Sequence, residues 1–203
     1  MVTEFPSLQG VMGRNYALLD GYPVEIAEAV KEHYSPLGPN DRVPKGNISI
    51  ILALSEKLEY LTAFWSIGIK PTGSKDPFAL RRASLGIIRI IIENRLKLNL
   101  YDLISLSMHK FDKENLLSFF KERIVHYLAV LGYEKSVTLS VVNADNLKSL
   151  YFFPTLIEKI ESYIKSPHGG QILAMNKRAS NILNGFTENI NNIKKTVSEV
   201  GTK

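Results

Sequence analysis

The sequence predicts an all-α fold. Apolar residues recur at three- and four-residue steps over long stretches, and clusters of Pro, Gly, Asn and Asp separate these stretches. The β-branched stretch at 136–142 is the one strand candidate, and an isolated strand would have no partner, so we expect helix or loop there. A chain of 203 residues that is 45% hydrophobic can bury the core of one domain or of two small helical ones.

The first predicted helix begins at Pro23, because Pro is tolerated at the first helical position, where its missing N–H is not needed. It ends at Ser35-Pro36, which is followed by Gly38-Pro39. A loop then leads to Gly46. Residues 48–66 form the most apolar helix candidate, with an apolar stripe at helical spacing.

A loop rich in Gly and Pro follows at 68–77, and the next helix should have Asp76 as its N-cap and Pro77 as its first residue. The later predicted helices span 101–109, 113–131, 145–165 and 171–184, and Gly132 and Gly185 close the second and the last of them. A boundary near 132–136 divides the chain into 1–132 and 133–203.

Composition excludes several classes of protein. The chain has no cysteine, which excludes a disulfide framework, thiolate metal sites and a cysteine nucleophile, and fits a reducing cytosol. The N-terminus carries Glu4 and no apolar core segment, so it does not resemble a signal peptide. No apolar run approaches 18 residues, the length of a membrane span. We therefore expect a soluble, cytoplasmic protein that does not bind a membrane.

Positive charge gathers in the middle of the chain. The formal net charge is +5, and residues 68–97 carry seven Lys and Arg against two Asp and Glu. Such a segment could attract a polyanion, or it could be a solvated helix face with an excess of cations. Charge alone leaves both interpretations open.

The loop that begins at Gly68 resembles a phosphate-binding P-loop only in part. It reads GIKPTGSK, whereas that motif requires Gly-Lys-Ser/Thr at its end, and Pro71 removes one N–H from the cradle. Lys70 and Lys75 nevertheless flank the start of a predicted helix, where anions are favoured. The loop either meets the phosphates of an RNA backbone or is a capped surface turn.

No catalytic or metal-binding residue is predicted. The four histidines lack metal-ligand spacing, and no Gly-x-Ser-x-Gly motif is present. Glu56 and Glu59 share one face of a helix, where they could hold a cation, pair with a basic helix or form a solvated stripe. Further along, Lys177 and Asn181 are four residues apart with Arg178 beside them, which suits phosphate and base-edge contacts to single-stranded RNA or an ordinary exposed turn.

Three groups of strings resemble the bacterial glycyl-tRNA synthetase beta subunit. They are EFP, LQGVMG and YA within 4–17, then PTGSKDPFALRRA, LG and RII within 71–91, and AMNKRASNIL at 174–183. They stand in the order of that family and cover nearly the whole chain. The family commonly has Ala-Asp-Lys-Leu-Asp where this chain reads SEKLE at 55–59, so a tight metal geometry is not expected there.

The resemblance implies a tRNA-binding beta subunit of glycine–tRNA ligase. A separate alpha subunit would use ATP and Mg to attach glycine to tRNA(Gly), in a heterotetramer of two alpha and two beta subunits, and this chain would bind neither cofactor. Residues 1–132 would be a degenerate HD-type helical module and 133–203 a linker and the opening helices of an anticodon-binding domain, each incomplete because family members are several times longer. The implied tRNA-binding residues are Asn176, Lys177, Arg178, Lys70, Lys75, Arg81 and Arg82.

Two other functions stay open. An HD-type metal-dependent phosphohydrolase would need a His-Asp pair, and that dipeptide does not occur in the chain. A non-functional interaction fragment would keep the family's sequence without RNA binding.

Overall fold

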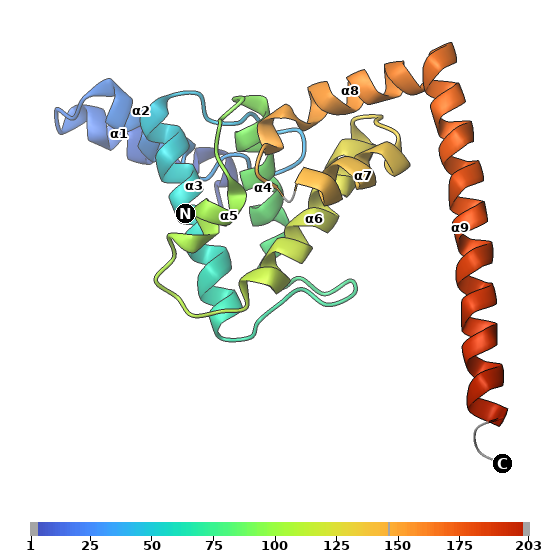
Figure 1. The fold of residues 1–203 in the computed structure, drawn as a ribbon. Helices are drawn as coiled ribbons and strands as arrows, with labels where there is room; N and C mark the ends of the chain where they lie inside the picture. The colour runs from blue at the N-terminus through green and yellow to red at the C-terminus, as the bar shows by residue number, and fades with distance from the viewer. Residues whose placement is uncertain (1–3, 146, 201–203) are drawn as a thin grey trace. The chain divides into compact units, whose positions relative to one another are not determined.

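A computed structural model describes residues 4–145 and 147–200, together with their side chains except those of 144, 145 and 185–200. The described residues form an all-α structure, as predicted, in which the single β-bridge joins Thr72 and Lys75 (Figure 1). The elements are η1 (Pro6–Leu8), α1 (Val11–Leu19), α2 (Val24–Glu32), α3 (Asn47–Ser66), α4 (Leu80–Glu93), α5 (Leu100–Ser105), α6 (Lys113–Val130), α7 (Lys135–Asp145), η2 (Leu150–Phe152), α8 (Phe153–Ile164) and α9 (Pro167–Val200).

The chain divides into two compact units, Met1–Ile157 and Glu158–Lys203. The first unit holds the core, and α9 belongs to the second. The division expected from the sequence, into an HD-like module at 1–132 and anticodon-binding helices at 133–203, stays a prediction. No helix in the described ranges is both long and apolar enough to cross a bilayer.

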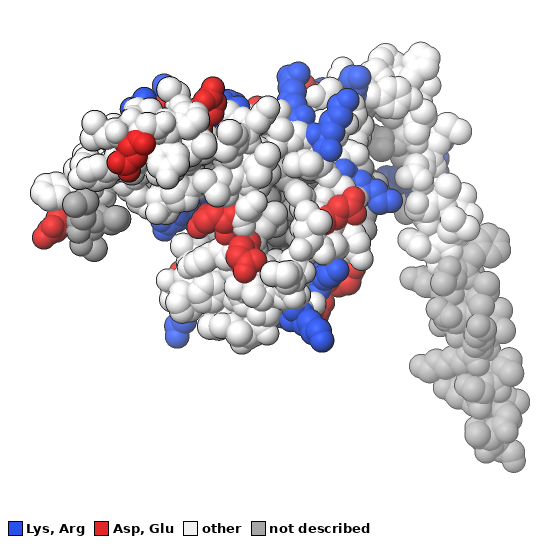
Figure 2. All heavy atoms as spheres, turned by 90° about the vertical axis from the view of Figure 1, so that its left-hand side faces the viewer, with Lys and Arg blue, Asp and Glu red and all other residues white. Residues whose placement is uncertain are grey.

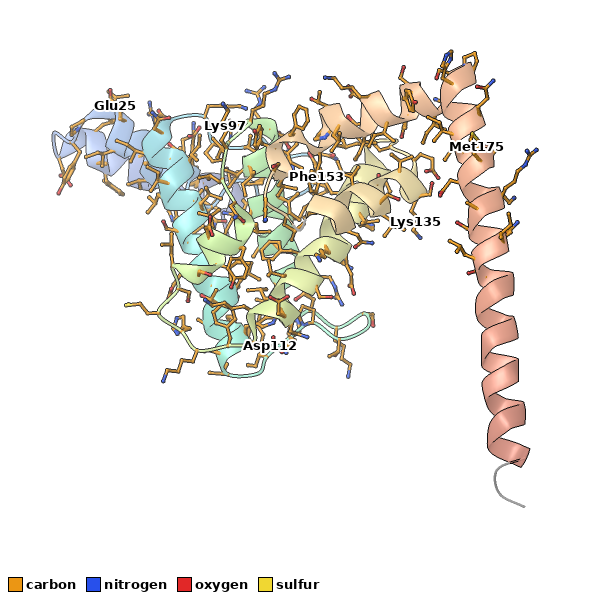
Figure 3. All side chains as sticks on the ribbon, in the orientation of Figure 1. Glu25, Lys97, Asp112, Lys135, Phe153 and Met175 are labelled. Carbon is orange, nitrogen blue, oxygen red and sulfur yellow. The ribbon has the colours of Figure 1, made fainter. Side chains whose placement is uncertain are left out.

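The core of the first unit is built around α4, which packs against α3, α6 and η2. Its isoleucines at 87, 88, 90 and 91 are completely buried. Phe120 of α6 and Phe153 of α8 are also completely buried, and Figure 3 shows Phe153 among the packed helices. Burial of these large apolar side chains away from water is what stabilises the unit.

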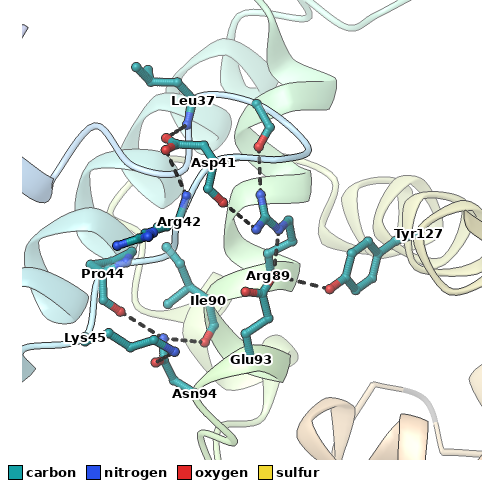
Figure 4. Close-up of polar contacts among 11 residues, drawn as sticks. Leu37, Asp41, Arg42, Pro44, Lys45, Arg89, Ile90, Glu93, Asn94 and Tyr127 are labelled. Carbon is teal, nitrogen blue, oxygen red and sulfur yellow. Dashed lines mark hydrogen bonds and ion pairs between the residues drawn. The ribbon is translucent and has the colours of Figure 1, made fainter. Parts of the chain in front are cut away.

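Arg89 of α4 is a buried cation that holds the loop before α3 (Figure 4). Its guanidinium donates to the carbonyl oxygens of Gly38 at 2.7 Å and Asp41 at 2.6 Å. Its Nε donates to Glu93 Oε1 at 2.6 Å. The side chain is only 7% exposed, so Arg89, one of the cations within 68–97, bonds to groups inside the protein and not to solvent.

The start of α4 differs from the prediction. The helix begins at Leu80 rather than at Pro77, because Ala79 adopts a left-handed conformation with φ 53° that interrupts the helix before it. Asp76 still caps the helix, since its carboxylate accepts from the backbone N–H groups of Leu80 at 2.8 Å and Arg81 at 3.0 Å. The N-cap position is nevertheless occupied by Ala79 and not by Asp76, so the predicted N-cap and the predicted first helical residue were both wrong by three positions, although the Asp76 side chain does bond to the first turn.

Three other elements differ from the sequence prediction. Helix α1 was not expected, and α9 continues past Gly185, where its end was predicted. The predicted helix at 145–165 is the short η2 followed by α8. The stretch at 136–142 is helical, within α7, in agreement with the expectation of helix or loop.

Candidate nucleic-acid interface

The loop between α3 and α4 is held in place by aromatic contacts. Phe78 stacks on Phe64 with the ring centroids 4.5 Å apart, and the Tyr60 hydroxyl donates to the carbonyl oxygen of Phe78 at 3.0 Å. At the tip, Thr72 and Lys75 exchange two backbone hydrogen bonds, of 3.1 and 2.8 Å. The loop is therefore an ordered projection from the core.

Arg81 fixes the conformation of this loop. One of its terminal nitrogens donates to the carbonyl oxygen of Gly73 at 2.6 Å, and the other lies 3.5 Å from the carbonyl oxygen of Lys75. A guanidinium bonded to two backbone carbonyls has fewer donors left for a ligand. The structure thus gives Arg81 a positioning role within the segment that was predicted to touch RNA.

Lys70, Lys75 and Arg82 present their charge to solvent. All three are exposed, and none of them forms an ion pair with another described residue. The Lys70 ammonium lies 5.9 Å from the centroid of the Trp65 ring, which fixes its stem at the base of the loop. These cations remain available for phosphate. On the face seen in Figure 2, Lys and Arg alternate with Asp and Glu over the surface.

The second predicted group lies on α9, in the other unit. Asn176, Lys177 and Arg178 are all exposed. Successive residues on an α-helix point about 100° apart, so these three side chains leave the helix in three directions. Asn181 is four residues after Lys177 and returns to the Lys177–Arg178 side, whereas Asn176 lies across the helix from Arg178. Lys177, Arg178 and Asn181 therefore share one face, and Asn176 does not.

The apolar side of α9 is exposed too. Ile172, Met175, Ile182 and Leu183 are each more than half exposed, and Met175 is labelled on the helix in Figure 3. They lie on one side of the helix, opposite Lys177. Asn176 borders this apolar stripe, so its amide lies beside an apolar surface.

The acidic residues Glu56 and Glu59 have different partners. The Glu56 carboxylate lies 3.5 Å from the Lys57 ammonium, and Glu59 Oε1 lies 2.7 Å from His109 Nε2. Throughout the described part of the chain, no three His, Asp or Glu side chains gather as a metal site would require. Glu56 is therefore paired with a lysine and Glu59 is in hydrogen-bond contact with an imidazole.

Lys57 is a buried cation on α3. Its ammonium donates to the carbonyl oxygens of His33 at 3.0 Å and Tyr34 at 3.1 Å. Burial lowers the pKa of Lys57, while the nearby Glu56 charge acts in the opposite direction. Lys57 therefore joins α3 to the end of α2 and is not offered to a ligand.

Sequence reasoning also missed a basic groove between α6 and α7. Lys121, Arg123, His126 and Lys135 line it together with apolar residues such as Leu139. The Nε of Arg123 is buried and makes no hydrogen bond in the described structure. Lys121, Arg123 and His126 all lie on α6, and only the packing of α7 on α6 brings Lys135 beside them, which no local sequence pattern indicates.

The sequence is similar to proteins of one known family. Residues 1–143 match the family model described as glycyl-tRNA synthetase beta subunit. The chain is 42% identical over 188 residues to the glycine–tRNA ligase beta subunit of Ruegeria sp. (strain TM1040). The matched residues make up 93% of this chain and 27% of that protein. It is 43% identical over 183 residues to the protein of the same name from Paracoccus denitrificans (strain Pd 1222), with 90% and 27% covered. The chain thus spans about a quarter of the length of the curated relatives it matches.

Proposed function

The chain belongs to the glycyl-tRNA synthetase beta subunit family, and from this premise we propose that it is a tRNA-binding part of a glycine–tRNA ligase beta subunit. The observation that carries the proposal is the family match over residues 1–143, which includes the α3–α4 loop with its exposed cations. Both relatives carry the name glycine–tRNA ligase beta subunit.

In this proposal the chain contributes RNA binding, and the chemistry takes place elsewhere. A separate alpha subunit activates glycine with ATP and Mg and transfers it to tRNA(Gly), and two alpha and two beta subunits assemble in the cytoplasm. The division of labour agrees with the ordered basic loop, whose cations suit the RNA backbone, which carries one negative charge per phosphate.

The proposed contacts follow from exposure and position. Lys70, Lys75 and Arg82 on the first unit, and Lys177 and Arg178 on α9, neutralise phosphates, because they are exposed and extend into solvent. Asn176 is proposed as a contact to a base edge. Arg81 keeps the loop in the conformation that presents Lys75, through its hydrogen bonds to Gly73 and Lys75.

Replacing Lys177 and Arg178 together by Ala tests the contribution of α9. The affinity for tRNA(Gly) falls as salt rises, and each phosphate contact that is lost should make the slope of log affinity against log salt shallower by about one unit. The slope of the double variant should therefore be shallower by about one to two units. Fluorescence anisotropy with labelled tRNA over a salt series measures the slope. The control is Gln171→Ala with Ser180→Ala, two exposed uncharged positions of α9, which keeps both cations. An unchanged slope in the double variant would remove these side chains from the RNA contact.

A further inference from the structure

A small pocket lies beside the basic loop, between α3, the end of α2 and the start of α4. It encloses about 190 Å³. That is below the roughly 300–1,000 Å³ typical of pockets for drug-sized ligands, so the space suits a single ring system. It is lined by Tyr34, Pro36, Leu37, Glu56, Lys57, Tyr60, Phe78, Ala79, Arg82 and Ala83.

Three aromatic side chains form much of the wall and remain open to solvent. Tyr34, Tyr60 and Phe78 are 38%, 37% and 39% exposed, so each ring keeps part of its surface open to a ligand. Aromatic faces at such a surface are the platforms on which proteins stack unpaired bases.

The aromatic wall is preorganised by contacts behind it. The Tyr60 hydroxyl bonds to the Phe78 carbonyl at 3.0 Å, and the Phe78 ring stacks on Phe64. Next in the chain, Ala79 is held at φ 53°, a conformation that costs a non-glycine residue energy and is seen where the surroundings impose it. The side chains of this wall are therefore ordered before a ligand binds, so binding loses little free energy to ordering them.

Charged groups of both signs line the pocket. Arg82 is exposed and forms no ion pair with any other described residue, so its guanidinium can take a phosphate or stack on a base. The Glu56 carboxylate can accept a hydrogen bond from the N–H groups that bases carry on their edges. Two of the three N–H donors of Lys57 are taken by the carbonyl oxygens of His33 and Tyr34, so this ammonium contributes little to ligand binding.

We propose that this pocket binds one unpaired nucleobase of the RNA, stacked against the Tyr60 and Phe78 rings, with the adjoining phosphate on Arg82. The inference rests on the proposed function, because it assumes that the loop lies on RNA. A base in this pocket would let the protein distinguish single-stranded from double-stranded RNA, which the phosphate contacts of Lys70 and Lys75 alone do not do.

The test compares two RNAs that differ only in an unpaired end. One is a short blunt RNA duplex, and the other is the same duplex with a single-stranded overhang that carries a fluorescent base analogue quenched by stacking. The full chain should bind the overhang RNA roughly 5- to 150-fold more tightly than the blunt RNA and quench the analogue, since stacking a base on an aromatic side chain contributes by about this factor.

Variants then assign the preference to the pocket. Ala83→Leu should fill the pocket and abolish both the preference and the quenching, whereas Val130→Leu, at an exposed position of α6, should preserve them. Phe78→Leu keeps an apolar group against Phe64 and removes the aromatic face, so it should reduce the preference even if Ala83→Leu folds poorly. Circular dichroism checks the fold of each variant.

The outcomes separate the two proposals. Equal binding of both RNAs, or a preference that survives Ala83→Leu in a folded protein, overturns the base pocket, while salt-dependent binding of the blunt duplex still supports phosphate contacts. Failure of the folded chain to bind either RNA overturns the pocket and the proposed function together.

Discussion

At the scale of single residues, burial decides what a cation does in this protein. Arg82 and Arg89 are seven residues apart on α4, which is close to two turns, so they leave the helix on nearly the same side. Arg82 is exposed at the start of the helix, whereas Arg89 is 7% exposed and bonded to Gly38, Asp41 and Glu93. One cation is free for a ligand, and the other holds a loop.

Replacing Arg89 by Ala should therefore destabilise the protein strongly. The carbonyl oxygens of Gly38 and Asp41 lose their donor, and a buried polar group left without a partner costs about 1–3 kcal/mol. We expect the free energy of unfolding to fall by about 2–4 kcal/mol. Urea unfolding measures it, and Arg82→Ala is the matched control, with an expected change within about 0.5 kcal/mol. Similar losses in both variants would contradict this assignment.

Lys57 should make stability depend on pH in the alkaline range. Burial lowers the pKa of Lys57 in the folded chain, whereas a lysine in the unfolded chain has its ordinary pKa of about 10.4. Between the folded and the unfolded pKa, the unfolded chain therefore binds more protons than the folded one. The free energy of unfolding contributed by this group therefore rises as pH increases through that window.

A comparison with Lys57→Met isolates the effect. Wild type should gain stability relative to the variant as pH rises towards about 10, measured by urea unfolding at a series of pH values. Tyr127, whose pKa is raised chiefly by burial, also contributes to the pH dependence of stability, but it is present in both proteins and cancels in the difference. A difference that stays constant with pH would show that Lys57 does not titrate as proposed.

At the scale of elements, local pattern predicted the helices that carry their own apolar stripe. Residues 48–66 and 113–131 were placed almost as α3 and α6 are found, because their apolar spacing is regular and Gly132, at φ 93°, ends the second. Helix α1 buries none of its residues. It is held by packing against α2 and by the Arg14–Glu28 ion pair, so tertiary contacts that no local pattern contains decide its existence.

The same limit applies to the candidate site. The exposure of Lys70, Lys75 and Arg82 agrees with what their loop and cap residues indicated. The structural duties of Arg81, Arg89 and Lys57 could not be predicted, since their partners are backbone carbonyls of other segments or of the loop itself. Only the packing of the folded chain distinguishes a cation bonded inside the protein from an exposed one.

Two glycines test how α1 is attached. Gly10 and Gly21 both have positive φ, at 77° and 82°, so an alanine at either costs roughly 1–2 kcal/mol of backbone strain. At Gly10 the added Cβ would lie 2.4 Å from the carbonyl oxygen of Lys31, whereas at Gly21 nothing lies within 4 Å. Gly10→Ala should therefore lose a further 1–3 kcal/mol or so of stability by overpacking. Equal effects in urea unfolding would mean that α1 does not pack closely on α2.

At the scale of the whole molecule, the net charge of +5 matters less than its distribution. Two groups of exposed cations lie on separate compact units, one on the α3–α4 loop and one on α9. Each group alone offers a few phosphate contacts, and such contacts give binding that weakens steeply with salt. If both groups engage one RNA, their contributions combine as in any linked pair of binding sites.

The central claim is that this chain binds tRNA as part of a glycine–tRNA ligase beta subunit. The most direct test is the affinity of the purified chain for tRNA(Gly) and for a non-cognate tRNA over a salt series, with and without the alpha subunit. We expect salt-sensitive binding that favours tRNA(Gly), either alone or once the alpha subunit is added. Equal weak binding of both tRNAs would reduce the chain to a basic surface, and no binding by a folded chain would contradict the claim.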